Sequence, residues 1–431
     1  MAKDFDLTTV LRQLCRAAKP LAVTSGATKN QVLRAISTAV TARAEEILEA
    51  NTLDLEQRRG EAVPSWELDS LKLTPERLQY VAEQLHQLAV LSDPIGAIDS
   101  SWRFDTNITM TRYRIPLGAI ALAYEIYPEW CLNGIGMALK TGNSIIVTSD
   151  RRLSATQDAM VEITRTAAYE AGLPEGAIQS IPGGETDDFI SLLRQSRYLK
   201  LVLACGRRHW VAEIAERSAV TTLTAELPRC LIYIDKSATW EQVWESVLRH
   251  PCLPDCRASA TSGKRLIYHL PYLQCLLHAD WAQQYFDAFL TQLRQQECEL
   301  RGRDMSTLSP TAGMDSSLPR TNVGVTSGEP TTGESEIQVE RVADMDEAIA
   351  FVDTLGDGRA VAIVTDSQAN ARRFARQVDS SVVFINRFPD VAEIARSSTG
   401  AYLGWATPAL PARGLVDLQA LTTVKYLAEG D

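Results

Sequence analysis

The sequence predicts an α/β fold with two doubly wound domains, and three observations lead to that prediction. The chain has 431 residues, which is more than one ordinary hydrophobic core accommodates. Helical and strand-like patterns alternate from about residue 130 onward, as they do in parallel βαβ units. A second series of the same kind begins with the stretch CLIYID at residue 230.

The first part of the chain has the pattern of helices followed by strands. Two helices are expected over residues 7–22 and 28–56, and the second spaces its apolar side chains at the helical period. Another helix is expected in LTPERLQYVAEQLHQLAVL, which starts with the favourable run Thr74, Pro75 and Glu76. The stretch 104–124 alternates and then becomes apolar throughout, which predicts strands.

The alternation that follows predicts the parallel sheets. A helix WCLNGIGMALKTG, ended by Gly142, precedes the strand NSIIVT, and the helix SATQDAMVEITRTAAYEAGLP comes next. The strands AIQSIPG and YLKLVLAC then flank the helix TDDFISLLRQS. The second series ends with the strand LTTVKYLAEGD and is interrupted at 303–335, where many Ser, Thr, Gly and Pro residues predict a long mobile loop.

Composition narrows the class of protein. With 45% hydrophobic and 23% charged residues, the chain is typical of soluble globular proteins, and we expect neither a signal peptide nor a membrane span. The 8 scattered cysteines favour a reducing, cytoplasmic location, and the net charge of -11 disfavours non-specific nucleic-acid binding. Cys252 and Cys256 beside His250 lack a second ligand pair, so we predict no metal site.

Eight stretches of the sequence carry a resemblance to a known family: RAEEILEANTLDLE, LKLTPERLQYVAEQLHQLAVLSDPIG, RIPLGAIALAYE, LKTGNSIIV, AYEAGLPEGAIQ, DEAIAFVDTLG, AIVT and ALTTVKYLAEGD. In them, and over almost the whole chain apart from 303–335, the protein resembles γ-glutamyl phosphate reductase, the glutamate-5-semialdehyde dehydrogenase of proline biosynthesis. The resemblance implies an aldehyde-dehydrogenase-like fold with two doubly wound α/β domains and a β-strand oligomerisation arm. It also implies a chemistry in which NADPH reduces a thioester formed when a cysteine attacks γ-glutamyl phosphate.

The same resemblance implies a division of the chain. Residues 1–103 and 125–235 correspond to a Rossmann-like, formerly cofactor-binding domain, and residues 236–404 to a formerly catalytic domain. Residues 104–124 and 405–431 correspond to the arm, which in the superfamily adds strands to a partner subunit.

The position of the family's nucleophile is occupied by alanine. The family pattern S-V-C-N-A-A-E-T-L-L-V-H places cysteine nine residues before the closing histidine, and counting back from His269 leads to Ala260. Cys256 lies four residues upstream of Ala260 and could replace the nucleophile only through a shift of the loop. We interpret Cys256 as a small apolar residue and expect no catalytic residue here.

Two further motifs have changed in the same way. The family pattern Y-E-A-R-P-N-V appears as YEIYPEW, so that Glu129 replaces the asparagine that donates to the oxyanion and Tyr127 replaces a substrate-side arginine. The loss of one such donor raises the barrier by about 3 to 4 kcal/mol. In the C-terminal site segment, Asn386 and Arg413 keep the family spacing, but Arg396 stands where a glutamate should contact the nicotinamide.

The cofactor groove is the fourth altered segment. The candidates for cofactor contacts are Thr148 and Arg151 after one strand, and Gly206 and Arg207 after another, where an arginine replaces a family glycine. Arg151, Arg152, Arg207 and Arg208 could bind a phosphate or form a solvated basic rim, and we favour the rim.

Together these changes predict a catalytically inactive relative that acts as a binding, scaffold or regulatory protein. Tyr127, Asn386 and Arg396 would line the old substrate cleft, no cofactor is expected, and the arm would form a homodimer or a hetero-oligomer with another protein. The alternative is an active NADPH-dependent reductase. A third possibility, altered chemistry at Cys256 or Cys205, ranks last.

Overall fold

The computed structural model divides the chain into two compact units, which we describe separately. Unit 1 comprises residues 1–63, 67–226 and 392–431, and unit 2 comprises 64–66 and 227–391. The residues that the structure describes are 6–57, 65–104, 107–184, 186–226, 230–249, 272–295, 299–301, 336–356, 358–390, 402–406, 408 and 410–430. The predicted loop 303–335 therefore lies outside the described residues.

The main sheet of unit 1 has seven strands in the order β15-β14-β7-β6-β3-β4-β5. The five parallel strands are β3 (Ala119–Tyr124), β4 (Ser144–Ser149), β5 (Ile178–Ser180), β6 (Leu201–Gly206) and β7 (Thr222–Glu226). The short strands β14 (Trp405–Ala406) and β15 (Gly414–Leu415) extend it in antiparallel pairing. Since β4 and β5 lie on one side of β3 and β6 and β7 on the other, the strand order reverses between β3 and β6.

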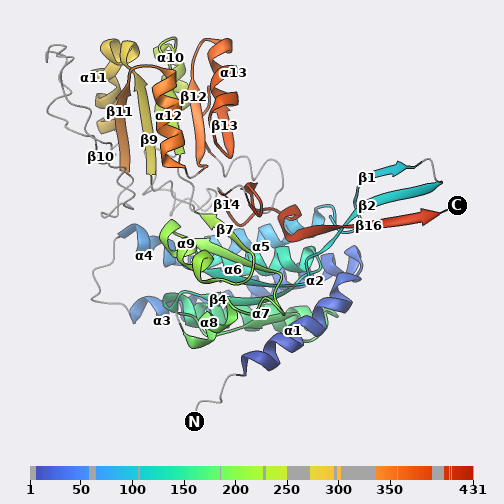
Figure 1. The fold of residues 1–431 in the computed structure, drawn as a ribbon. Coiled ribbons are helices and arrows are strands. Elements are labelled where there is room, and N and C mark those ends of the chain that lie inside the picture. The colour runs from blue at the N-terminus through green and yellow to red at the C-terminus, as the bar shows by residue number, and fades with distance from the viewer. Residues whose placement is uncertain are drawn as a thin grey trace. The chain divides into compact units, whose positions relative to one another are not determined.

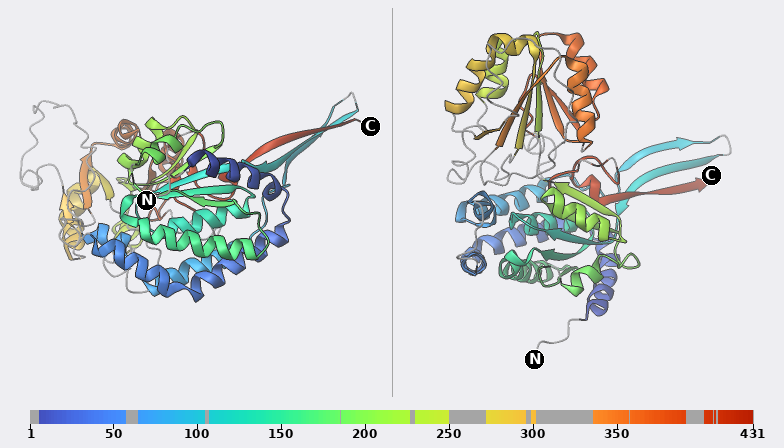
Figure 2. Two further views of the ribbon diagram at one scale, coloured as in Figure 1. Left: turned by 90° about the horizontal axis from the view of Figure 1, so that it is seen from below. Right: turned by 60° about the vertical axis from the view of Figure 1, so that its left-hand side comes forward.

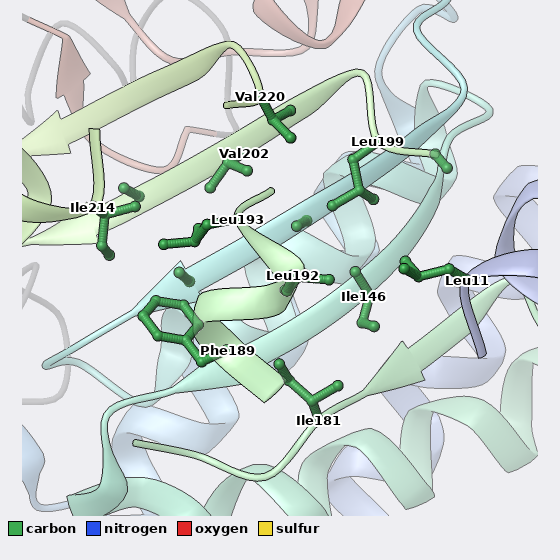
Figure 3. Close-up of a cluster of buried hydrophobic side chains, with 14 of the residues drawn as sticks. Leu11, Ile146, Ile181, Phe189, Leu192, Leu193, Leu199, Val202, Ile214 and Val220 are labelled. Carbon is green, nitrogen blue, oxygen red and sulfur yellow. The ribbon is translucent and has the colours of Figure 1, made fainter. Parts of the chain in front are cut away.

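Helices cover both faces of this sheet. They are α1 (Leu7–Ala22), α2 (Gly26–Ala42), α3 (Ala44–Glu56), α4 (Ser65–Leu71), α5 (Pro75–Val90), α6 (Glu129–Lys140), α7 (Ser154–Glu170), α8 (Asp187–Leu192) and α9 (Arg208–Arg217). On one face, Leu11 of α1 and Phe189 of α8 pack with Ile146 and Val202 of the sheet (Figure 3). On the other face α6 packs so closely that a Cβ added at Gly134 would lie 2.5 Å from a methyl of Leu122.

Unit 1 also carries a separate three-stranded antiparallel sheet, which we call the arm. It consists of β1 (Ile98–Arg103), β2 (Ile108–Pro116) and β16 (Thr422–Gly430) in the order β1-β2-β16, and it extends away from the layered part of unit 1 (Figures 1 and 2). The predicted arm ranges, 104–124 and 405–431, were therefore wrong in part. They omit β1, and they include β3, β14 and β15, which belong to the seven-stranded sheet. Every side chain of β3 is buried, which a strand covered by helices on both faces requires.

Unit 2 contains one parallel sheet in the order β10-β11-β9-β8-β12-β13. Its strands are β8 (Cys230–Ile234), β9 (Tyr272–His278), β10 (Glu299–Arg301), β11 (Glu336–Val342), β12 (Ala360–Val364) and β13 (Val382–Ile385). The helices are α10 (Trp240–Val243), continued by a π-helical turn over Trp244–Leu248, and α11 (Ala279–Gln295), α12 (Met345–Leu355) and α13 (Gln368–Gln377). The predicted α/β class with parallel sheets and a small antiparallel sheet is confirmed.

Two details of the prediction need correction. The helix expected over 28–56 is two helices, because Arg43 leaves the helical conformation (φ -111°, ψ 27°) between α2 and α3. The boundary expected after residue 235 also differs, because β8 pairs with β9 and β12 at the centre of the unit 2 sheet.

Within the described residues, no helix is both long and apolar enough to cross a membrane.

Candidate functional site

The carboxyl ends of β3 and β6 form the edge at which doubly wound sheets bind their ligands. In such sheets the ligand lies where the strand order reverses. The chain leaves β3 through Glu125 and reaches the start of α6 at Glu129, and Tyr127 between them takes a left-handed conformation (φ 51°). Several of the residues singled out in the sequence therefore meet at this edge.

Glu129, at the predicted oxyanion-donor position, is a buried partner of Arg77. The Arg77 guanidinium of α5 forms an ion pair with the Oε1 atom of Glu129, and the two side chains are only 7% and 4% exposed. It also donates to the carbonyl oxygens of Asp69 (2.8 Å) and Ser70 (3.2 Å) and to that of Lys72. Oε2 of Glu129 is buried without a hydrogen-bond partner in the described part of the chain. An ionised carboxylate accepts hydrogen bonds, so Glu129 offers no donor to an oxyanion.

Tyr127, a predicted substrate-cleft residue, packs inside unit 1. Its ring is fully buried and meets Trp130 edge to face, with centroids 5.2 Å apart and planes at 82°. Such a contact is a packing interaction between aromatic rings. The structure therefore gives Tyr127 a place in the hydrophobic core.

Five charged side chains form a cluster at the carboxyl edge of the sheet, which we call the arginine–carboxylate cluster: Glu67, Glu125, Asp150, Arg152 and Arg207. Glu125 accepts hydrogen bonds from the backbone N–H (3.1 Å) and the Nε (2.9 Å) of Arg207. Arg152 contacts Glu125 (3.2 Å) and Asp150 (2.8 Å) and pairs with Glu67. The Glu125 side chain is 2% exposed and those of Arg152 and Arg207 are 12% and 18% exposed.

This arrangement corrects the interpretation of the arginines. Arg152 and Arg207 are largely buried and paired with carboxylates, so neither belongs to a solvated basic rim. Arg151 is exposed, as the rim interpretation expected. Thr148, the remaining cofactor candidate on β4, is buried with its hydroxyl 3.5 Å from the carbonyl oxygen of Pro182.

The residues at this edge do not fit a dinucleotide, the ligand that the fold implies. A Cβ added at Gly206 would lie 2.9 Å from the Trp210 ring and 3.1 Å from Glu125, so the glycine is in contact with protein atoms. The guanidinium groups of Arg152 and Arg207 are both paired with carboxylates of the cluster. A pyrophosphate would meet packed atoms and would compete with these carboxylates for the arginines.

Asn386 of unit 2, a predicted substrate-cleft residue, binds backbone. It follows β13 in a left-handed conformation (φ 52°), and its side-chain amide accepts from the N–H of Thr365 (2.9 Å) and donates to the carbonyl oxygen of Thr365 (3.0 Å). Asp235 lies near Asn386, since both bind Thr365, and the sequence analysis did not single it out. Burial raises its pKa, but hydrogen bonds from Ser237, Asn370 and Thr365 outweigh burial, and the pKa is lowered overall. In the sequence, only its position directly after the apolar strand β8 indicates that Asp235 lies at the carboxyl edge of the sheet.

The remaining predicted positions lie outside the described residues. These are Ala260, Cys256 and Arg396, together with the pair Cys252 and His250 considered for metal. In the part of the chain that the structure describes, no group of three or more His, Cys, Asp or Glu side chains is placed to hold a metal ion.

Two of the cysteines in unit 1 are poor nucleophiles. Cys205 on β6 and Cys131 on α6 are both fully buried. Burial raises the pKa of the Cys131 thiol to about 12 and also raises the pKa of Cys205. Because the thiolate is the reactive form, this environment argues against altered chemistry at Cys205.

Comparison with known proteins places these features in context. The sequence model of the aldehyde dehydrogenase family matches residues 2–248. A γ-glutamyl phosphate reductase from Gloeobacter violaceus is 32% identical over 422 residues, which cover 96% of this chain and 94% of the relative. One from Salmonella paratyphi C is 29% identical over 431 residues, with 98% and 99% coverage.

Solved structures show the same fold. The crystal structure of γ-glutamyl phosphate reductase from Thermotoga maritima superposes with a TM-score of 0.84 at 24% identity and covers 99% of each chain. An engineered glycolyl-CoA reductase with bound NADP+ superposes with a TM-score of 0.66 at 12% identity, covering 98% of this chain and 96% of that one.

The buried thiols give a first testable prediction. In the native protein at about pH 8, Cys131 and Cys205 should resist alkylation by iodoacetamide, since raised pKa values leave almost no thiolate and burial excludes the reagent. Mass spectrometry of each cysteine peptide, before and after unfolding in guanidinium, measures this directly. Rapid native labelling of Cys205 would contradict the described burial.

The Arg77–Glu129 pair gives a second prediction. Glu129→Gln should lower the free energy of unfolding by about 3 kcal/mol, because it leaves a buried guanidinium without its counter-charge. The matched control is Glu46→Gln in the exposed pair with Arg43, which should change the free energy of unfolding far less because solvent screens that pair. Urea denaturation measures the free energy of unfolding of both variants. If both lose the same amount, the buried pair contributes no more to stability than a surface pair.

Proposed function

We propose that this chain, which belongs to the γ-glutamyl phosphate reductase family of the aldehyde dehydrogenase superfamily, no longer performs that reduction and acts through protein contacts. The observation that carries the proposal is the buried, ion-paired carboxylate of Glu129 at the position where the family resemblance requires a hydrogen-bond donor. Because this carboxylate is held by Arg77 and has no hydrogen to donate, it cannot stabilise the negative charge that develops on a tetrahedral intermediate.

The nucleophile position supports the same proposal. A thioester mechanism needs a thiolate to attack the acyl phosphate, and the family motif aligns Ala260 with the cysteine. Alanine has no lone pair to form the new bond. A substitution at one position could be compensated nearby, whereas the nucleophile and the oxyanion donor are changed in two separate segments of the chain.

The second candidate function is an active, NADPH-dependent γ-glutamyl phosphate reductase. The match to proteins of that name over nearly their full length favours it. It requires another nucleophile, of which Cys256 is the nearest in sequence to Ala260. The two candidates differ in a single measurable property, turnover.

A direct assay distinguishes the two candidates. With glutamate-5-semialdehyde, phosphate and either nicotinamide cofactor, the purified protein should give no reduction of the cofactor above background, because a thiolate and an oxyanion donor are both missing. The control is a reductase relative assayed under the same conditions. Turnover that disappears in Cys256→Ser would refute the proposal and identify a shifted nucleophile.

The arm is the surface through which we propose the protein contacts. β16 pairs with β2 over Thr422–Gly430 on one side and is the last strand in the order of its sheet. Trp102 and Tyr426 meet edge to face at 6.2 Å and remain 37% and 54% exposed. An edge strand bearing exposed aromatic side chains is a pairing surface, and a second copy of the chain or another protein would cover it.

Truncation tests the role of the arm. Deleting residues 421–431 removes β16, and we expect the protein to lose its assembly and to fail in complementing a knockout of its own gene, because the edge strand that would pair with the partner is gone. Light scattering after size exclusion gives the mass of the assembly. The control deletes only Asp431, and a monomeric truncated protein that complements fully would refute the role.

A further inference from the structure

We propose that the arginine–carboxylate cluster is an internal lock that occupies the dinucleotide crevice of unit 1, so that the protein does not bind NADPH. This inference concerns nucleotide binding and goes beyond the loss of thioester chemistry proposed above. It depends on three features of the described residues: the place of Glu125, the connections of the two arginines, and the packing at Gly206.

Glu125 lies where the sheet would present a ligand's anion. It directly follows β3, and its backbone N–H donates to the carbonyl oxygen of Cys205 on β6 at 3.1 Å, which places it at the reversal of strand order. Its carboxylate accepts the backbone N–H of Arg207, the residue that precedes the first turn of α9. Backbone N–H groups at a helix start commonly bind phosphate oxygens, and here a protein carboxylate takes that place. Glu125 matches the glutamate of the family pattern Y-E-A-R-P-N-V, so the change specific to this chain is Arg207, which stands in place of a family glycine.

The two arginines join this carboxylate to two other parts of unit 1. Arg207 reaches Glu67 of α4 at 3.5 Å as well as Glu125. Arg152 also pairs with both glutamates, and with Asp150 after β4. A phosphate that bound these guanidinium groups would compete with carboxylates that lie within the same chain. Such displacement leaves buried carboxylates unpaired, which is unfavourable.

The packing at Gly206 shows that the crevice is also filled sterically. In a dinucleotide site, a glycine allows the cofactor to approach the backbone closely. Here the Trp210 ring and the Glu125 side chain occupy that approach, since an added methyl would lie 2.9 Å from one and 3.1 Å from the other. Charge and space therefore exclude the same ligand.

Calorimetric titration with NADPH, without any substrate, tests the lock. The wild-type protein should show no binding up to millimolar nucleotide, whereas Arg207→Gly combined with Glu125→Gln should gain at least about tenfold in affinity, since the first change restores the family glycine and the second releases the remaining arginine, Arg152, from Glu125. Arg217→Ala, in an exposed pair with Glu213, is the matched control and should remain without binding.

Two results would overturn the inference. One is micromolar NADPH binding by the wild type that weakens in Arg207→Gly, because Arg207 would then be a phosphate ligand. The other is a folded double variant that gains no binding, because the cluster would then not be what excludes the nucleotide. Circular dichroism establishes whether each variant is folded.

A measurement on the unmodified protein covers the case in which the variants do not fold. Phenylglyoxal should modify the exposed Arg151, while Arg152 and Arg207 stay unmodified whether or not NADPH is present. Modification of Arg207 as rapid as that of Arg151, or protection of Arg207 by NADPH, would refute the lock. NADPH binding found in this experiment would refute the lock but not the proposed loss of thioester chemistry. Turnover in the enzymatic assay would refute that proposed loss.

Discussion

The side chains at the carboxyl edge of the unit 1 sheet are arranged around one buried carboxylate, that of Glu125, whose charge they neutralise. A carboxylate that is 2% exposed is stable as an anion only when it is paired and hydrogen-bonded. Arg207 and Arg152 meet that need, but both are themselves largely buried and require further carboxylates. Glu67 supplies one of these, and α4 is thereby tied to the ends of β3, β4 and β6.

Two residues at the start of α6 also have structural roles. The family resemblance aligns Glu129 with an asparagine and Tyr127 with an arginine. Glu129 forms a buried ion pair with Arg77, and Tyr127 packs against Trp130. Both residues therefore help to hold the segment between β3 and α6 in place.

The sequence predicted those parts of the structure that depend on local pattern. The apolar strands and amphipathic helices were identified because burial imposes a period on the side chains, and their alternation led to parallel sheets. The extent of the arm was mistaken because β2 and β3 are neighbours in sequence but lie in different sheets, a difference decided by tertiary packing. The motif indicates where Glu129 lies. It does not indicate that Arg77 is its partner, because the two residues are 52 positions apart and no sequence pattern connects them.

The partners of Arg152 and Arg207 were missed for a similar reason. An arginine beside a glycine suggests an exposed or anion-binding role, and only the fold brings Glu67 within reach of both side chains. Ala260, Cys256 and Arg396 depend on the resemblance alone, because they lie outside the described residues. The candidate site could thus be located from sequence, while its charge balance required the structure.

The discontinuity of unit 1 has a consequence for how the chain is made. Its strands β14, β15 and β16 follow unit 2 in the chain, whereas β2 and β7 precede the unit 2 sheet. β14 pairs with β7, and β16 pairs with β2. Pairings so distant in sequence form slowly, because a long loop must close first. A nascent chain therefore carries unpaired edges at β7 and β2 until β14 and β16 have been synthesised, and such edges are exposed to pairing with other chains in the meantime.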